Sequence, residues 1–378
     1  MALTLHGTVS DNTAALDRKT ATPIIINGDM QIAQRGRSAT ELGNGNTGYH
    51  TLDRFQFRED GSPTYEFTMS QSTDTPTGEG FSQSLKLDCT TADTSLAGAD
   101  ALGIRHTVEA QNLQMLKYGT SSAEALTLSF WVKTNKTGTY TLWVYSDDGS
   151  RNISQTYTVS SANTWEKKII NIDADTGGTI NNDNGIGLII GWYLGAGTDF
   201  TSGTLNTSWN SLVTANRVSS SQVNISDSTD NEWYLTGVQL EVGTFDSNSI
   251  PPFQFEDKST SLTRCQRYYM KIGGEASDDN VFGSGYSTSG TGVRFVTSFP
   301  TTLRAPATAI ETTGTAADYR ILGGGASVKN MSAVPTFNAC GTTSARTTGT
   351  VSSGLTAYNG LIVDTAVDDT YLAWDAEL

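Results

Sequence analysis

The clearest alternation of apolar and polar residues lies between residues 126 and 145. Apolar side chains occupy every second position of the runs 126–132 and 140–144, and a polar segment, 134–138, separates the two runs. A repeat of two places successive side chains on opposite faces of a strand, and a short polar turn between two such runs predicts a β-hairpin. One face would be aliphatic, and the other would carry Trp131, Trp143 and Tyr145.

Short alternating segments continue on both sides of this hairpin, from residue 51 to about residue 256. Polar, glycine-containing turns separate them, and the best helix candidate, residues 108–118, is short. Such a series predicts antiparallel sheets packed as a jelly-roll-like β-sandwich. The predicted strands are 53–57, 65–69, 83–87, 126–133, 140–145, 153–159, 165–172, 185–194 and 232–242.

The first 50 residues show no sustained periodicity. They contain one short apolar run, Ile24, Ile25 and Ile26, between polar and glycine-rich stretches. A segment with so little apolar surface does not fold by itself. We therefore predict that residues 1–50 form an extended attachment arm, which includes this apolar run and becomes ordered on another protein or on a neighbouring subunit.

A second β region follows the first. The pair Pro251-Pro252 interrupts the strand pattern, and a bridge through residues 261–269 leads to further alternating segments that end with 371–374. Prolines interrupt regular strands, and domain boundaries often fall in such segments. The expected organisation is an arm over 1–50, a sandwich over 51–256 and a smaller β domain over 257–378.

Composition and charge narrow the class of protein. Hydrophobic residues make up 37% of the chain, and its 38 glycines favour many turns in an all-β fold. The 24 basic and 39 acidic residues give a net charge of −15, which opposes binding to nucleic acid or to an anionic membrane. No apolar run approaches the roughly 18 residues of a membrane span. We expect a soluble protein without a signal peptide and without membrane insertion.

The sequence offers little for catalysis or cofactor binding. The three histidines lie far apart, and the three cysteines fit neither a zinc site nor a disulfide framework. Neighbouring acids occur in segments typical of turns. We therefore expect no enzyme and no cofactor, although a polysaccharide depolymerase stays open because two suitably spaced acids suffice for it. A structural calcium ion is the alternative to turn chemistry for Asp173, Asp175 and Asp183, whose oxygens are suitable ligands.

The aromatic face of the hairpin is the strongest candidate for binding. A flat row of rings from Trp131, Trp143 and Tyr145 would suit the C–H faces of sugars, with Asn and Asp side chains supplying hydrogen bonds. The alternative is that a loop, the helix candidate or a neighbouring subunit covers this face, which is the more frequent situation for tryptophan.

Seven segments stand out as sequence motifs. They are IINGDMQIAQRG (25–36), LDRF (52–55), FWVKTNKTGTYTL (130–142), NTWEKKIINI (163–172), NDNGIGLIIGWYLGAG (182–197), WYLTGVQLEVG (233–243) and RCQRYY (264–269). In this order they resemble the tail-fibre and other virion appendage proteins of tailed bacteriophages, notably phages of marine bacteria.

The resemblance implies a central domain similar to the jelly rolls of carbohydrate-binding modules. It also implies a structural protein of the virion, assembled in the host cytoplasm: a homotrimeric tail fibre or appendage that docks to other virion proteins by its N-terminal arm. The β domains would then face the host surface, with glycan as the candidate receptor. A head fibre or capsid decoration protein without essential glycan binding is the alternative. The family contributes no catalytic motif that maps onto this chain.

Overall fold

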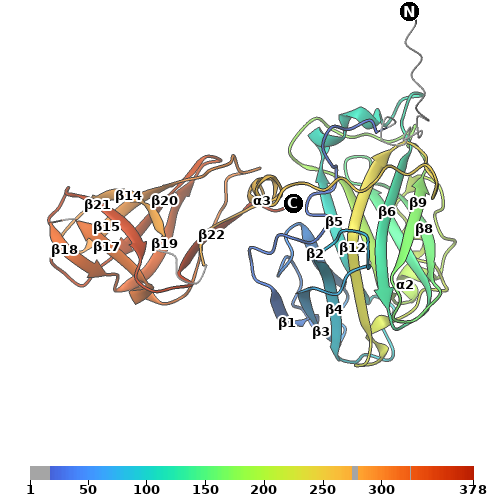
Figure 1. The fold of residues 1–378 in the computed structure, drawn as a ribbon, viewed down its shortest axis with the longest axis horizontal. Coiled ribbons are helices and arrows are strands. Elements are labelled where there is room, and N and C mark those ends of the chain that lie inside the picture. The colour runs from blue at the N-terminus through green and yellow to red at the C-terminus, as the bar shows by residue number, and fades with distance from the viewer. Residues whose placement is uncertain (1–17, 275–279, 324) are drawn as a thin grey trace, which may run out of the picture. The chain divides into compact units, whose positions relative to one another are not determined.

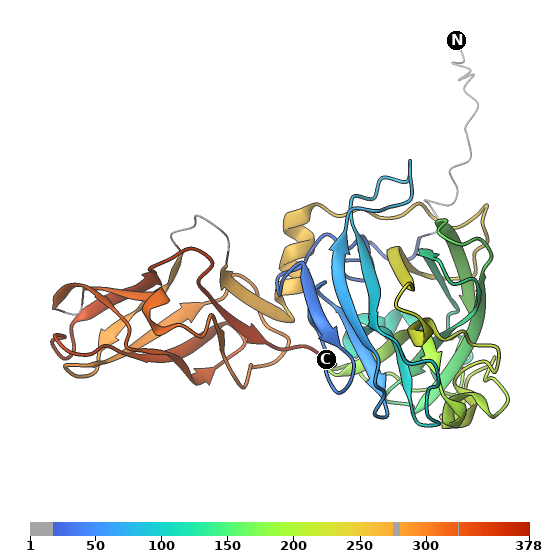
Figure 2. The same ribbon diagram turned by 90° about the horizontal axis from the view of Figure 1, so that it is seen from below.

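The protein is all-β and divides into two compact units. The computed structural model describes residues 18–274, 280–323 and 325–378. The first unit is Met1–Glu256 and the second is Asp257–Leu378. Antiparallel strands dominate both units (Figures 1 and 2), which confirms the predicted fold class.

The first unit is a jelly-roll-like β-sandwich of two six-stranded antiparallel sheets. Sheet A has the strand order β1 (Ser38–Leu42), β3 (Glu66–Ser72), β4 (Ser84–Thr91), β12 (Glu232–Val242), β6 (Leu126–Thr134) and β9 (Glu166–Ile172). Sheet B has the order β11 (Asn210–Ser211), β8 (Arg151–Val159), β7 (Gly138–Ser146), β10 (Ile186–Ala196), β5 (Ala101–Glu109) and β2 (Phe55–Asp60).

The inner faces of sheets A and B form one hydrophobic core. On β6, Leu128, Phe130 and Val132 are fully buried in it. Trp192 of β10 and Trp233 of β12 are also fully buried in the same core. Burial of each aliphatic or phenyl side chain contributes roughly 1.5–3 kcal/mol. The alternation along each strand therefore decides which of its faces turns inward.

The predicted hairpin over residues 126–145 is wrong. Both of its strands form, as β6 and β7, but they lie in different sheets. β6 pairs with β12 and β9, whereas β7 pairs with β8 and β10. The link 135–137 is thus an arch between the sheets. The sequence pattern is the same in both arrangements, because two strands of a sandwich turn their apolar side chains toward one core.

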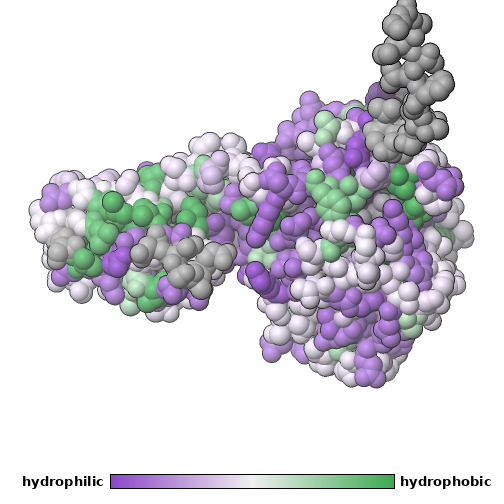
Figure 3. All heavy atoms as spheres, in the orientation of Figure 1, coloured by the Kyte–Doolittle hydropathy of each residue, from purple (hydrophilic) through white to green (hydrophobic). Residues whose placement is uncertain are grey.

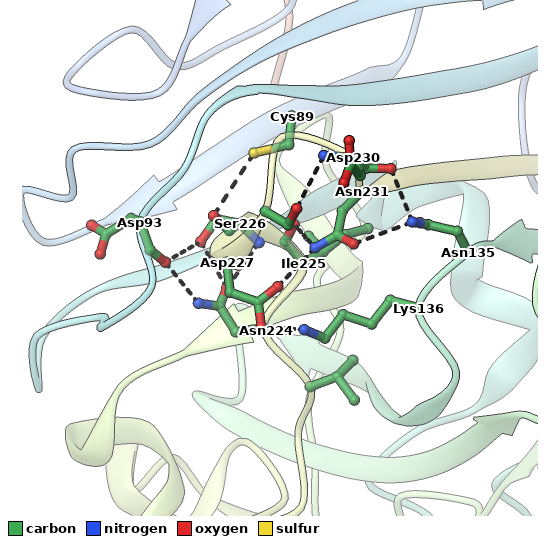
Figure 4. A network of polar contacts seen from close by, with 12 residues as sticks. Cys89, Asp93, Asn135, Lys136, Asn224, Ile225, Ser226, Asp227, Asp230 and Asn231 are labelled. Atoms are coloured by element: carbon green, nitrogen blue, oxygen red, sulfur yellow. Dashed lines mark hydrogen bonds and ion pairs between the residues drawn. The ribbon is translucent and has the colours of Figure 1, made fainter.

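A polar network at the end of the sandwich holds this arch (Figure 4). The side-chain amide of Asn135 donates to the carbonyl oxygen of Asp230 at 2.9 Å and to Oδ1 of Asn231 at 3.3 Å. Lys136 pairs with Asp227, and Asn231 donates to the same carboxylate at 2.8 Å. The arch is therefore fixed by residues that lie about 95 positions later in the chain, just before β12.

The predicted arm is wrong for its described part. Ile24 and Ile25 belong to the core of the first unit, with exposed fractions of 8% and 2%, and Ile26 is 7% exposed. The side-chain amide of Asn27 donates to the carbonyl oxygen of Asp53 at 3.0 Å, and β1 joins sheet A beside β3. The apolar run therefore completes its own sandwich. Residues 1–17 of the predicted arm lie outside the described residues.

The predicted helix over 108–118 is only partly right. Its first two residues complete β5, and Ala110–Leu116 forms the 3₁₀ helix η1. Three further short helical elements of the first unit are α2 (Thr198–Thr201), η2 (Thr214–Asn216) and η3 (Ile225–Asp227). Among the described residues, no helix has the length and apolar character needed to cross a membrane.

The second unit begins with α3 (Lys258–Gln266), which is seen end-on in Figure 1 and from the side in Figure 2. Asp257 caps this helix by accepting from the backbone N of Thr260 at 3.0 Å. Phe295 and Trp374 belong to a separate hydrophobic core.

Two sheets and one short helix complete the second unit. Sheet C has seven strands, in the order β18 (Ala326–Asn330), β17 (Tyr319–Gly323), β21 (Gly360–Thr365), β14 (Val281–Ser287), β15 (Gly292–Ser298), β20 (Ser344–Thr350) and β19 (Ala333–Cys340). Sheet D has three, β13 (Tyr269–Gly273), β22 (Tyr371–Asp375) and β16 (Glu311–Thr312), and η4 (Ala316–Asp318) precedes β17.

Candidate functional site

A pocket with a volume of about 210 Å³ lies on the outer face of sheet A, over β6, β9 and β12. Aromatic and polar side chains line it in equal number, together with Gly237 and Pro252. They are the aromatic Trp131, Phe81, Phe253 and Phe255, and the polar Ser129, Gln239, Lys167 and Glu79.

The strand register brings the residues of the pocket floor together. Trp131 of β6 has Lys167 of β9 as its Cα partner on one side and Thr236 of β12 on the other. The residues before and after Trp131 point into the core, so its ring points outward. Ser129 lies two positions earlier on the same face, opposite Gln239.

A β-bulge in β12 makes room for the aromatic rings. The register between β12 and β6 shifts between Thr236 and Gln239, and Gly237 adopts a φ of +61°. A Cβ atom at this glycine would lie 2.7 Å from Cζ of Phe81 and 3.0 Å from Cδ1 of Trp131. The first distance is too short for two carbon atoms and the second is a tight contact, so glycine lets the rings approach the strand here.

The segment 251–255 forms another wall of the pocket, which Pro252, Phe253 and Phe255 line. Phe253 and Phe255 pack against Phe81, with ring centroids 5.0 and 5.2 Å from its own. Phe255 is 48% exposed, so one ring of the wall faces solvent. The sequence pattern identifies this segment only as an interruption of the strands. Aromatic residues beside a proline pair were the available signal, but they have no periodicity that assigns them to a face.

The proline pair of this wall is tied to sheet A. Nε2 of Gln239 donates to the carbonyl oxygen of Pro251 at 2.9 Å, and Nη2 of Arg18 donates to that of Pro252 at 2.6 Å. Arg18 also forms an ion pair with Glu241 of β12 at 2.8 Å. The wall is thus held in place by the sheet on which the pocket lies.

Four polar groups of the lining are free to meet a ligand. Within the described part of the chain, Oγ of Ser129, Oε1 of Gln239, the Lys167 ammonium and the Glu79 carboxylate form no hydrogen bond or ion pair. Ser129 and Gln239 are 2% and 7% exposed and lie on the floor, whereas the two charged residues are exposed. Aromatic surfaces combined with a few converging polar groups are typical of small-ligand sites.

The other two predicted platform residues lie on the opposite side of the sandwich. Trp143 and Tyr145 belong to β7 of sheet B, where their rings stack with centroids 5.2 Å apart. Trp143 is only 3% exposed, because the Arg217 guanidinium lies 4.4 Å from its ring centroid and Phe200 packs in the same cluster. The predicted three-ring platform is therefore wrong, and only Trp131 reaches the pocket.

The three aspartates predicted as calcium ligands have separate roles. Asp175 is 1% exposed and accepts from Nε of Arg151 at 2.9 Å. Asp183 accepts from the backbone N of Gly185 at 2.8 Å, and Asp173 is exposed. In the part of the chain that the structure describes, no group of three or more His, Cys, Asp or Glu side chains is arranged to hold a metal ion. The predicted calcium ligands do not come together.

Comparison with known proteins gives weak likenesses. No protein-family model matches the chain, and no curated protein matches it. Among solved structures, the enzymatically active domain of bacteriophage CBA120 tailspike protein 4 aligns with 14% identity and a TM-score of 0.29, over 50% of this chain and 19% of that one. The match thus spans about a fifth of the tailspike domain.

Two sugar-related structures align at a similar level. A putative sugar-binding protein from Bacteroides thetaiotaomicron has 11% identity and a TM-score of 0.30, over 58% of this chain and all of that one. A family 11 carbohydrate-binding module of a Clostridium thermocellum cellulase has 12% identity and a TM-score of 0.26, over 55% and 96%. At these scores the likeness is weak, and the strand order defines the fold of this chain.

Proposed function

We propose that this chain is a saccharide-binding attachment protein and that the pocket on the outer face of sheet A is its binding site. The geometry of the pocket is the main support for this proposal. One indole ring and three phenyl rings surround a volume of about 210 Å³, beside four polar groups without partners in the described part of the chain. Sugars present C–H faces that pack on rings and hydroxyls that bond to such groups.

The wider role that we propose is that of a bacteriophage virion protein. The seven sequence motifs support it, because they resemble those of tail-fibre and appendage proteins. The resemblance supports a homotrimeric appendage, and the pocket supports the binding of host-surface glycan by this appendage. A head fibre or decoration protein is the alternative, and the position of the protein on the particle distinguishes the two.

Binding without cleavage is the activity that we propose for the pocket. Glycoside hydrolysis ordinarily uses two carboxyl groups that flank the scissile bond. The pocket lining contains one carboxylate, that of Glu79, and this residue lies in an exposed turn. A single acid at the edge of an aromatic pocket suits a hydrogen bond to a sugar hydroxyl.

The variant Trp131→Ala tests the proposed function. Calorimetric titration of the full chain with host-surface polysaccharide and with defined neutral and acidic oligosaccharides would measure binding. Loss of one stacking ring should weaken binding by roughly 1 kcal/mol, which is about fivefold. The melting temperature should change little, because Trp131 lies outside the core.

Tyr145→Ala is the matched control, since it removes a partly exposed ring from the opposite sheet. Its saccharide affinity should equal that of the unmodified chain. Equal affinities of the unmodified chain and Trp131→Ala, or no binding to any of the saccharides, would exclude the pocket as a saccharide site.

A further inference from the structure

The second unit exposes an unusual amount of apolar side chain. Of the eleven large hydrophobic residues that are exposed in the described part of the chain, seven belong to this unit, which is about a third of the sequence. Figure 3 shows hydrophobic atoms at the surface of this unit. Single exposed apolar residues are ordinary, but a contiguous set marks an interaction site.

The register of sheet C places several of these residues in one row. Across four neighbouring strand pairs, Val328 lies opposite Leu322, Leu322 opposite Ile362, Ile362 opposite Ser284, and Ser284 opposite Val296. The residues beside Ile362 and Val296 on their strands point into the core, so the row lies on the outer face. We call Val328, Leu322, Ile362 and Val296 the apolar row. Val328, Ile362 and Val296 are 50%, 41% and 45% exposed.

Tyr286 extends the apolar row at one side, and Tyr358 lies in the turn that precedes β21. Tyr286 lies opposite Gly360 and is 38% exposed, and Tyr358 is 81% exposed. Tyr358 has a φ of +67°, which is an outlier for a bulky residue. Its backbone N donates to the carbonyl oxygen of Ser287 at 2.6 Å, so a hydrogen bond helps to hold the strained residue in place. Strain of this kind is concentrated at functional positions.

The charges on the same face that have no ion-pair partner in the described part of the chain are basic. Arg294 and Arg346 alternate with core residues of β15 and β20 and form no ion pair in the described part of the chain. Arg320 also lies on this face, but it is neutralised by two hydrogen bonds to Asp364 at 3.0 and 2.8 Å. The face therefore carries two uncompensated arginines on a chain whose net charge is −15.

These features indicate a protein partner with an acidic surface. Branched aliphatic side chains such as those of the apolar row bury well against protein, and tyrosine and arginine, which lie beside the row, are enriched in protein–protein interfaces. Two copies of this face would not pair with each other, because their arginines would be brought together. A second copy of the chain can offer the complementary charge, because its 39 acidic residues outnumber its 24 basic residues.

We propose that the outer face of sheet C docks onto an acidic surface of a second copy of this chain. The contact is heterologous, so its repetition closes into a ring or continues as a filament. The row alone exposes much less than the roughly 800 Å² per partner of a standard interface. The association is therefore weak for a single contact and sensitive to salt.

Sedimentation velocity of the full chain over a range of concentrations, at low and at high salt, tests this proposal. The unmodified protein should form oligomers whose proportion rises with concentration and falls at high salt. Ile362→Thr, which keeps a β-branched side chain, and Arg346→Glu should each shift the association midpoint at least tenfold toward higher concentration. Val367→Thr is the control, because Val367 is 51% exposed but lies in a turn outside the sheet.

Each outcome decides for or against the proposed contact. Loss of association in Ile362→Thr and Arg346→Glu, with none in Val367→Thr, supports it. A monomer at every concentration overturns it, and so does an oligomer that tolerates both substitutions. If Ile362→Thr dissociates the oligomers but neither salt nor Arg346→Glu has an effect, the partner surface is not acidic and the proposed contact is wrong. Circular dichroism confirms that each variant is folded, and the proposed saccharide site plays no part in the readout.

Discussion

Arg217 determines the surroundings of Trp143. Its guanidinium lies 4.4 Å from the ring centroid of Trp143 and 5.3 Å from that of Phe200, so the outer face of sheet B is closed at this point. Trp131 has the same alternation with core residues on its own strand, yet it borders an open pocket. The difference between the two tryptophans comes from distant segments that cover one sheet and leave the other open.

Trp143→Ala should destabilise the protein strongly. The substitution leaves a cavity beneath Arg217 and removes the ring on which Tyr145 stacks, and we expect a loss of about 3–5 kcal/mol in the free energy of unfolding. Urea denaturation followed by circular dichroism measures it. Trp131→Ala is the comparison and should cost less than about 1 kcal/mol. Equal, small losses for both variants would mean that Trp143 is not a core residue.

The thiols should be unreactive in the folded protein. Cys89 and Cys265 are buried, and burial raises the pKa of Cys89 to about 11. Burial also raises the pKa of the partly exposed Cys340. The reactive thiolate is therefore scarce at pH 8. Labelling with a disulfide reagent should modify at most Cys340 in the native state and all three thiols in urea; rapid native labelling of Cys89 would contradict the burial described.

At the scale of elements, residues 18–42 are part of the sandwich. Ile25 and Met30 are 2% and 0% exposed in its core, and β1 covers the edge of β3 in sheet A. β1 pairs only with β3 and is therefore the edge strand of sheet A. It is short and its register with β3 is irregular, which discourages pairing with another chain. This segment is therefore an integral element, although its sequence has no repeating pattern.

Truncation distinguishes an integral segment from an arm. A chain that starts at Arg18 keeps every described contact of the first unit and serves as the reference. A chain that starts at Thr51 lacks Ile25, Met30 and Leu42 and exposes the core residues that they cover. Burial of each of these three side chains contributes roughly 1.5–3 kcal/mol to the free energy of unfolding. That loss approaches the whole stability of a typical domain, about 5–15 kcal/mol. Cooperative, native-like melting of the Thr51 chain would contradict the account.

Sequence alternation predicts the strands well, and it predicts their pairing poorly. The all-β class and the two strands over 126–145 follow from local pattern, because each strand needs one apolar face. Whether β6 and β7 pair with each other depends on Asn135 and Lys136, whose partners lie just before β12. The alternation along β6 places Trp131 on the outer face and so predicts it as a candidate binding residue. No local pattern does this for Phe253 and Phe255, because their position depends on contacts with distant Phe81.

At the scale of the whole molecule, each unit has its own type of surface. The first unit has an aromatic pocket with free polar groups, which suits a saccharide. The second unit has an aliphatic row flanked by arginines, which suits protein. On this account, one chain combines ligand binding with self-association. Several copies acting together would raise the avidity for a repeating glycan, although each pocket binds weakly.

A crystal structure of the full chain with the saccharide that binds most tightly would show directly whether the pocket on sheet A is the binding site. We expect a sugar ring packed on Trp131, with Phe253 nearby and hydroxyls within hydrogen-bond distance of Oε1 of Gln239 and Oγ of Ser129. A saccharide bound away from this pocket, for example beside Tyr145 on sheet B, would contradict it.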